Sequence, residues 1–361
     1  MNILQATHEY ERWSARQVPF VPADLRLKHR MMTQSAFSFL RATCYRWLQV
    51  WPEVCADLTA APALRAVADL HVENFGTWRD SEGRLIWGIN DFDEACVFPY
   101  ASDLVRLVVS AKLAGRAEHL AVKLDEACDA VLTGYLEGLR AGGRPFVLSE
   151  QHAWLRDIAT NSLRDPVKFW KKMAALPMIQ DTVPPEVTNA LEKVMPEAGL
   201  SYGLRRRVSG LGSLGRPRVV ALADWRGGKI AREAKRLIAS AGLWARGQKP
   251  IGTLLYQLML ERSVRCRDPF VGMDGSWLLR RLSPYCSRIE VTALPKKRDE
   301  GKLLYAMGWE TANVHLGDRA QIKAVQRDLA ARKSAWLKKA AKAMLKTTVA
   351  DWKDWAEHHA E

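Results

Sequence analysis

The sequence predicts an α+β protein with two lobes, a mainly helical large lobe and a small antiparallel β lobe. Apolar residues recur at helical spacing through much of the first half, and glycine-rich and β-branched segments then follow. Helical periodicity returns near the end of the chain. We expect four parts: an N-terminal arm at 1–30, a helical lobe at 31–198, a β-rich lobe at 199–295, and C-terminal helices at 296–361 that return to the large lobe.

Composition narrows the functional classes. The chain has 361 residues, 48% of them apolar, which is enough for a substantial core. A net charge of +14 attracts polyanions such as nucleotides, and nucleic acid stays an alternative partner although no recognisable reader motif accompanies the charge. The six cysteines lack metal-ligand spacing, and no apolar run is long enough to span a bilayer. We therefore expect a cytoplasmic protein.

Helices account for most of the first half. A periodic run from Met32 to Val50 predicts one helix ended by Pro52, and Ser102 is a candidate N-cap for the next. Further helices are expected at 118–141 and within 150–198.

Between these helices lies a polar segment that predicts a loop, a hairpin and a second loop. Asp69 and Asn74 occupy the first loop, and Asp91 and Asp93 follow an apolar run that ends at Ile89. Phosphoryl transfer needs a carboxylate to accept the acceptor's proton, and amide and carboxylate oxygens to hold magnesium. Asp69 suits the first role, Asn74 and Asp91 the second, and Asp93 could extend the metal shell. Each residue alone could equally be a turn-forming side chain.

The motifs ADLHVENFG and INDFDEA carry a family resemblance. They are similar to the catalytic and metal loops of the aminoglycoside-phosphotransferase branch of the protein-kinase-like superfamily. The chain resembles more closely the bacterial domain-of-unknown-function family 2252, also at residues 31–41 and 305–318. The resemblance implies a kinase-like fold that uses ATP and magnesium, without identifying a substrate. It also implies that Asp103 braces the catalytic loop by accepting backbone hydrogen bonds; the alternative is an ordinary first-turn acid.

A glycine-rich segment follows in the second half. Gly210, Gly212 and Gly215, with Ser213 among them, are followed by a β-branched run that reads as a strand. Strand, glycine loop and strand is the arrangement that covers phosphates in kinases, since backbone N–H groups can approach closely where no Cβ intervenes. A plain hairpin turn is the structural alternative.

The next strand should carry a phosphate-binding lysine, but the position that the resemblance assigns to it holds Arg232. Lys229 or Lys235 could substitute. The acidic partner of this cation is expected at Glu261, on a helix at 250–265, with Glu233 as the alternative.

The remaining segments complete the two lobes. We expect strands within 276–294, a helix at 300–316 and one long helix at 319–347, with His315 as a packed or surface residue rather than a catalyst. The catalytic loops precede the glycine loop, which reverses the usual kinase order. Either the small lobe follows the catalytic half through a circular permutation, which we favour, or one of the two motif sets is accidental.

Together these features predict an ATP- and magnesium-dependent phosphotransferase that acts on an unidentified hydroxyl acceptor. A pseudokinase, which binds nucleotide or a protein partner without transfer, is one alternative. Nucleotidyl (AMP) transfer on the same fold is another.

Overall fold

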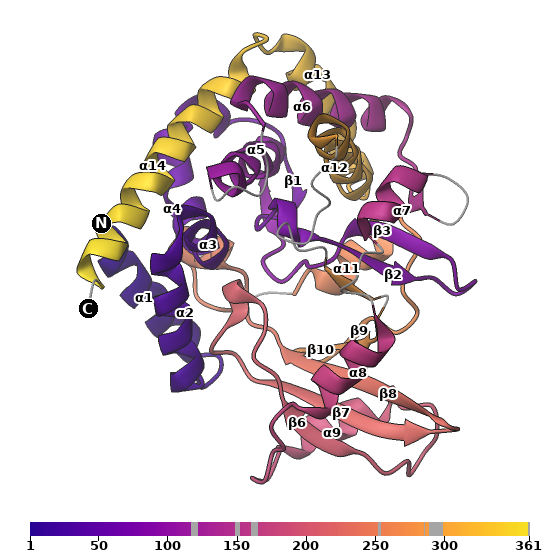
Figure 1. The fold of residues 1–361 in the computed structure, drawn as a ribbon. Coiled ribbons are helices and arrows are strands. Elements are labelled where there is room, and N and C mark those ends of the chain that lie inside the picture. Colours follow the sequence, from indigo (N-terminus) through magenta and orange to yellow (C-terminus); the bar gives the residue numbers. More distant parts are fainter. Residues whose placement is uncertain are drawn as a thin grey trace.

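The computed structural model describes residues 1–116, 122–148, 152–159, 165–251, 254–284, 286–288 and 299–359. The fold is mixed α+β and mostly helical, with small antiparallel sheets (Figure 1). The described helices are α1 Ile3–Ala15, α2 Pro22–Gln34, α3 Ala36–Ala42, α4 Cys44–Val54, α5 Tyr100–Arg116, α6 Leu124–Arg140, α7 Ala153–Ala159, α8 Pro166–Ala174, α9 Pro185–Glu192, α10 Ala241–Ala245, α11 Tyr256–Arg262, α12 Glu300–His315, α13 Arg319–Ala331 and α14 Trp336–His358. None of these helices combines the length and the apolar character that a membrane span requires.

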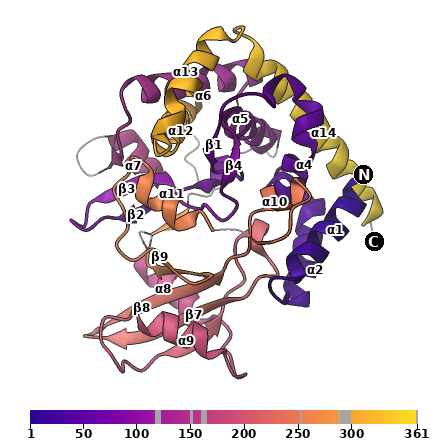
Figure 2. The same cartoon turned by 180° about the vertical axis from the view of Figure 1, so that it is seen from behind.

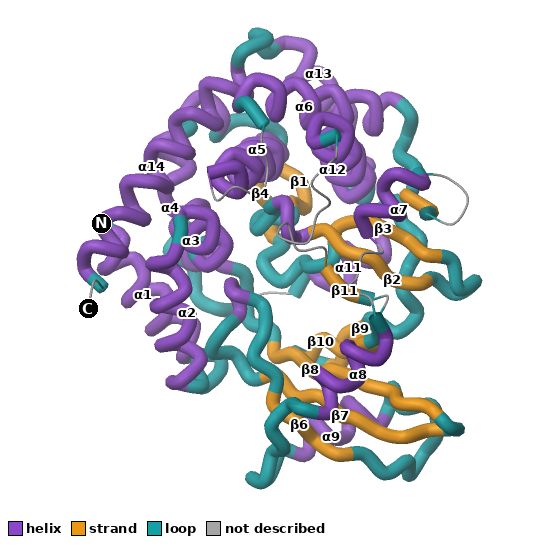
Figure 3. The backbone as a smooth tube through the Cα atoms, in the orientation of Figure 1, coloured by secondary structure: helices purple, strands orange, loops and turns teal. Residues whose placement is uncertain are grey.

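The described strands form three sheets. A five-stranded antiparallel sheet has the order β6-β7-β8-β10-β9, a four-stranded sheet has the order β11-β2-β3-β5, and β1 pairs with β4. The strands are β1 Ala63–Ala66, β2 Phe75–Arg79, β3 Leu85–Ile89, β4 Cys96–Pro99, β5 Phe146–Val147, β6 Gly203–Arg206, β7 Arg218–Trp225, β8 Gly228–Arg236, β9 Gly272–Asp274, β10 Trp277–Leu282 and β11 Ser287–Arg288. The five-stranded sheet lies at one end of the molecule, and most helices lie at the other (Figure 3).

The C-terminal helix closes the helical part. α14 runs beside α1, α2 and α4, and the two chain ends lie close together in both views (Figures 1 and 2). Its buried residues include Leu337, Met344 and Trp355, which join cores built by the first half of the chain. Residues from the two ends of the sequence therefore share one apolar core.

The expected helix from Met32 to Val50 is three helices instead. Breaks occur at Ser35, which is extended and accepts a hydrogen bond from the Ser38 N–H, and at Thr43, whose hydroxyl donates to the Phe39 carbonyl. These side chains compete with the backbone for hydrogen bonds, so the apolar pattern continues where the helix does not. Pro52 lies inside α4, which ends two residues later, at Val54.

The predicted long helix at 319–347 is also wrong, because α13 ends at Ala331 and α14 begins at Trp336. Arg332 adopts an extended conformation, and its guanidinium binds Asp328. The break allows Val325 of α13 and Leu337 of α14 both to be buried. The helix expected at 300–316 is confirmed as α12.

Other boundaries differ in smaller ways. The first residues 1–30 contain α1 and most of α2, and α5 begins at Tyr100, before the proposed cap Ser102. The Ser102 hydroxyl instead accepts a hydrogen bond from the Trp47 indole. The helix expected at 250–265 is shortened to α11, with residues 252–253 outside the described part. The strand segment at 289–294 and the boundary at 295–296 also lie outside it.

The five-stranded sheet has helices on both faces. α9 packs through Val187 and Leu191 against one face, and α8 packs through Met173 against the other. These two helices, which we expected in the helical lobe, thus pack on the β-rich part of the chain.

Candidate functional site

Asp69 lies in a backbone turn that a buried acid supports. Oδ2 of Asp103 accepts the Val67 N–H at 2.7 Å, and Oδ1 accepts the Ala68 N–H at 2.9 Å. Ala68 has a φ of 64°, a left-handed conformation that costs an L-residue energy unless its surroundings hold it. Asp103, at the start of α5, therefore has the bracing contacts that the resemblance implied.

His315 contacts the Asp103 carboxylate and helps to hold it in place. Its Nε2 lies 3.0 Å from Oδ2 of Asp103, and its Nδ1 lies 2.8 Å from the Tyr135 hydroxyl. All three side chains are fully buried. Of the two expected alternatives, packed or surface, His315 is therefore the packed one, and it orients Asp103.

The Asp69 carboxylate faces a large cavity. The cavity has a volume of about 680 Å³, and Asp69 lines it together with Asn74, Asp91 and Asp93. Oδ1 of Asp69 accepts a hydrogen bond from Nη2 of the buried Arg106 at 2.5 Å. Burial raises the pKa of Asp69 to about 6, although Arg106 opposes this rise.

Asn74 joins the two polar loops. Its Oδ1 accepts the Asp91 N–H at 3.0 Å, while its Nδ2 donates to the carbonyls of Asp69 and Asp91, both at 3.1 Å. The hairpin of β2 and β3 brings the loops together, because Phe75 pairs with Ile89 at its base. One amide side chain thus fixes the spacing between Asp69 and Asp91.

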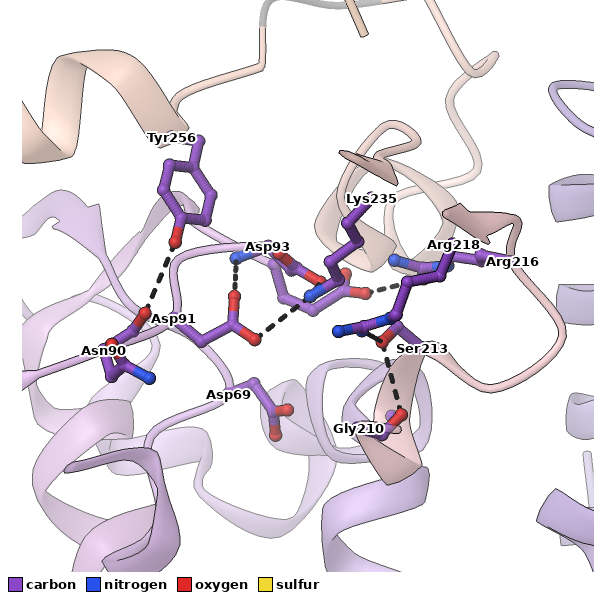
Figure 4. Close-up of polar contacts among 12 residues, drawn as sticks. Asp69, Asn90, Asp91, Asp93, Gly210, Ser213, Arg216, Arg218, Lys235 and Tyr256 are labelled. Atoms are coloured by element: carbon purple, nitrogen blue, oxygen red, sulfur yellow. Dashed lines mark hydrogen bonds and ion pairs between the residues drawn. The ribbon is translucent and has the colours of Figure 1, made fainter. Parts of the chain in front are cut away.

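Two carboxylates follow β3 and share one lysine. Nζ of Lys235 lies 3.1 Å from Oδ2 of Asp91 and also forms an ion pair with Asp93 (Figure 4). Burial opposes the charge on Asp91, but Lys235 outweighs it and lowers the pKa of Asp91. Burial and the neighbouring charge of Asp91 raise the pKa of Asp93. The Asp91 side chain is 40% exposed, so it reaches the cavity.

The glycine segment, residues 210–215, forms the facing wall. Gly210, Gly212 and Ser213 line the same cavity as the acids, and Figure 4 shows Gly210 and Ser213 opposite Asp69 and Asp91. Gly210 has a φ of 78°, and a Cβ on Gly212 would lie 3.1 Å from the Arg41 carbonyl oxygen. Both positions therefore favour glycine. Gly215 belongs to this segment, although it does not line the cavity.

Two leucines anchor this segment. Leu211 and Leu214 are buried in an apolar cluster with Met32 and Phe39 from α2 and α3. The Ser213 hydroxyl donates to the Gly210 carbonyl and accepts from Arg218. The segment is therefore held by its own side chains against the helical part of the chain, and Ser213 connects it to β7 of the five-stranded sheet.

Strand alternation decides which cation of β8 reaches the site. Glu233 and Lys235 lie on one face of β8, and Arg232 lies on the other, because side chains alternate along a strand. Arg232 donates to the Val194 carbonyl and stacks on Phe270. Lys229 pairs with Asp224 beside the turn between β7 and β8. Of the three candidate cations, only Lys235 is placed beside the acids.

The expected acidic partner is also placed elsewhere. Glu261 is exposed on α11, where it accepts a hydrogen bond from Gln257, and it does not line the cavity. The alternative, Glu233, is fully buried and contacts three arginines, Arg207, Arg218 and Arg280. These three arginines line the cavity, and they were not among the site residues predicted from the sequence. The pairing of Arg280 with Glu233 across β10 and β8 is the signal that could have revealed them.

We refer to the part of the cavity lined by Asn74, Asp91 and Asp93 as the acid side. Its side chains fit a magnesium ion that is also bound by a phosphate ligand. No group of three or more His, Cys, Asp or Glu side chains among the described residues is arranged to hold a metal by itself. Magnesium, however, commonly binds one or two carboxylates together with substrate phosphates and water. Asp91, Asp93 and Asn74 supply hard oxygen atoms, and Oδ1 of Asp93 is buried with no hydrogen-bond partner.

The sequence that contains these acidic residues matches a protein-family model. Residues 17–165 match the family model described as "Uncharacterized protein conserved in bacteria (DUF2252)". The match includes the loops that hold Asp69 and Asp91 and ends before the glycine segment. It supports, over these residues, the resemblance to the bacterial family of unknown function. No curated protein and no solved structure matches the chain.

Proposed function

We propose that this chain is an ATP- and magnesium-dependent phosphotransferase with a kinase-like two-lobe fold. The observation that carries the proposal is one cavity that is lined both by Asp69 and Asp91 and by the glycine segment. A catalytic carboxylate, metal-binding oxygens and a glycine loop across a cleft are the parts that kinase-type transfer requires.

The order of strands supports the kinase-like assignment. The glycine segment lies between β6 and β7, and Lys235 is on β8, the third strand of the same sheet. Kinases place their glycine loop and phosphate-binding lysine in the same sequence of strands. Because the acidic loops come earlier in this chain, we propose a circular permutation. The close chain ends are compatible with it, since permutation requires neighbouring termini (Figures 1 and 2).

The proposed chemistry follows from the positions of the side chains. The acceptor hydroxyl attacks the γ-phosphorus of ATP, the bond to the ADP oxygen breaks, and the hydroxyl proton passes to the Asp69 carboxylate. Arg106 holds this carboxylate at 2.5 Å and so fixes its direction. Asp91 and Asn74, with Asp93, would hold magnesium, which supplies charge neutralisation at the phosphates. The acceptor class stays open.

A nucleotide-binding module without transfer is the second candidate. It is favoured by the ion pairs of Lys235, which engage both Asp91 and Asp93, and by the close packing of Gly212 against Asp69. In such a module the same cavity would bind nucleotide, and no phosphoryl group would leave it.

Labelled ATP distinguishes these functions. The full chain is incubated with magnesium and ATP labelled at either the γ- or the α-phosphate, and label in an acceptor, in the protein or in inorganic phosphate is measured. We expect γ-label to be transferred, and Asp69→Asn and Asp91→Asn to slow the transfer by at least about 10²-fold. Asp224→Asn, an exposed acid on β7, is the control. Transfer of α-label would indicate nucleotidyl transfer, and magnesium-dependent binding without transfer would favour the binding module.

A further inference from the structure

Three arginines from different parts of the β-rich region converge on one buried carboxylate. Nη1 of Arg207 lies 2.5 Å from Oε1 of Glu233, Nη1 of Arg218 lies 3.1 Å from both carboxylate oxygens, and Nε of Arg280 lies 2.7 Å from Oε2. Strand pairing explains the last contact, because Arg280 of β10 is directly opposite Glu233 of β8. We refer to Arg207, Arg218 and Arg280 as the arginine cluster.

We propose that the arginine cluster binds the polyphosphate chain of the nucleotide, in the role that a single lysine has in an ordinary kinase. This inference rests on the proposed function, since it names the groups that hold the phosphates at the same site. Glu233 is then the residue that positions the arginines.

The charges of the cluster are unbalanced. Burial opposes ionisation of Glu233, but the three arginines hold its pKa well below the usual range, so it carries one negative charge against three positive ones. Excess charge that is kept from water favours a counter-ion. A phosphate chain would supply this counter-charge inside the cavity.

The geometry leaves donors for such an anion. Arg207 and Arg280 line the cavity with side chains 22% and 19% exposed. A guanidinium has five N–H donors, and phosphate accepts two of them in parallel. One carboxylate cannot use all donors of three arginines, so Arg207 and Arg280 can bind phosphate while still attached to Glu233.

Arg218 links the cluster to the glycine segment. Its Nη2 donates to the Ser213 hydroxyl at 3.1 Å, while its Nη1 contacts Glu233. The Arg218 side chain is 5% exposed, and it therefore acts mainly as a connection between Glu233 and the glycine segment. The cluster, the glycine segment and the Ser213 hydroxyl thus surround one part of the cavity.

Asp91 and Asp93 give the site a negatively charged group beside the positively charged arginine cluster. Lys235 is shared by two carboxylates, so this group is net negative, whereas the arginine cluster beside it is net positive. Arg280, which pairs with Glu233, lines the same cavity as Asp91, so the two groups of opposite charge share one cavity. Magnesium on the acid side and phosphate oxygens on the arginine side would satisfy both charges.

Calorimetric titration with inorganic tripolyphosphate, without magnesium, tests the cluster in the full chain. We expect Arg207→Gln and Arg280→Gln each to weaken binding by at least about tenfold, because each removes a charged, bidentate donor. Arg232→Gln, on the opposite face of the same sheet, should change affinity less than about twofold. Equal effects from Arg232→Gln, or no effect from the other two, would overturn the proposal. Thermal melting establishes that each variant is folded.

Two further ligands identify the source of the phosphates. ATP should compete with tripolyphosphate and adenosine should not, if the cluster holds the phosphates of a nucleotide. Tripolyphosphate binding that ATP fails to displace would overturn the nucleotide assignment. If binding depends on Arg207 and Arg280 but no phosphoryl transfer occurs, the cluster stands and the proposed transfer function fails.

Discussion

A Cβ atom on Gly212 would lie 3.5 Å from Oδ2 of Asp69. The two residues are distant in sequence, because Gly212 belongs to the glycine segment and Asp69 to the loop before β2. In the proposed function, the glycine segment and the proposed catalytic base would therefore contact a ligand at the same place.

Gly212→Val should reduce transfer without unfolding the chain. The new side chain would enter the space between the Arg41 carbonyl and Asp69, and displacement of reacting groups by about 1 Å can cost about 10²-fold in rate. Gly228→Val is the matched control, because a Cβ at Gly228 meets no atom within 4 Å. Steady-state rates and melting temperatures are compared for both variants. Equal rates for the two would argue against a role for the glycine segment.

Asp69→Asn should lower kcat by about 10² to 10⁴-fold, the usual contribution of a positioned general base. Asparagine retains the shape of the side chain but does not take up the hydroxyl proton. ATP binding, measured by calorimetry with magnesium, should change little because Asp69 is not among the residues assigned to the metal or the phosphates. An unchanged kcat would exclude Asp69 as the base.

The rate should depend on pH through the ionisation of Asp69. Burial raises the pKa of this carboxyl to about 6, and only the ionised form accepts a proton. The value of kcat/KM should therefore rise with pH through about 6 and level off above it. A profile that is flat, or that falls with increasing pH over this interval, contradicts the assignment.

Lys235→Met should destabilise the fold more than Arg232→Met. Lys235 is 2% exposed and forms ion pairs with Asp91 and Asp93, and removing one partner of a buried ion pair costs about 3 kcal/mol. Without lysine, the pKa values of both carboxylates should rise, so the loss should be large near neutral pH and smaller in acid, where the carboxylates take up protons.

Urea unfolding at neutral and acidic pH measures this difference. Arg232→Met is the comparison on the opposite face of β8, where the side chain contacts Phe270 and a backbone carbonyl. A loss for Lys235→Met that is independent of pH would show that the ion pairs do not determine it.

Local sequence predicted the hairpin that brings Asp69 and Asp91 together. Asp69, Asn74 and Asp91 line one cavity, and the hairpin expected between them is confirmed as β2 and β3. The short spacing explains this result, because a hairpin brings its two ends together regardless of the rest of the fold. The contacts of Asp103 join residues that are far apart in sequence, since its carboxylate accepts the N–H groups of Val67 and Ala68, and the expectation of them came from the family resemblance.

Which basic residues lie beside the acids depends on the tertiary structure. Arg232 occupies the position that the resemblance assigns to the lysine, but a shift of one residue along a strand moves a side chain to the opposite face. Lys235 therefore lies beside Asp91, and Glu233 gathers arginines from β7, β10 and the segment after β6. Motif spacing contains no information about which strands become neighbours. The pairing of β8 with β10 was needed to find the arginine cluster.

The long-range packing of helices was equally hard to predict. The run at 319–347 has continuous helical periodicity, yet the chain turns at Arg332 so that α14 can pack on α5 and α2. Periodicity reports which face of a helix is apolar, and the break is determined by what that face must contact.

A structure of the full chain with magnesium and a non-hydrolysable ATP analogue tests the central claim most directly. We predict that the triphosphate lies between Asp91 and the glycine segment, with magnesium on the Asp91 carboxylate and with Arg280 on a phosphate oxygen. A nucleotide bound outside this cavity, or phosphates that contact neither Asp91 nor the residues 210–215, would contradict the account.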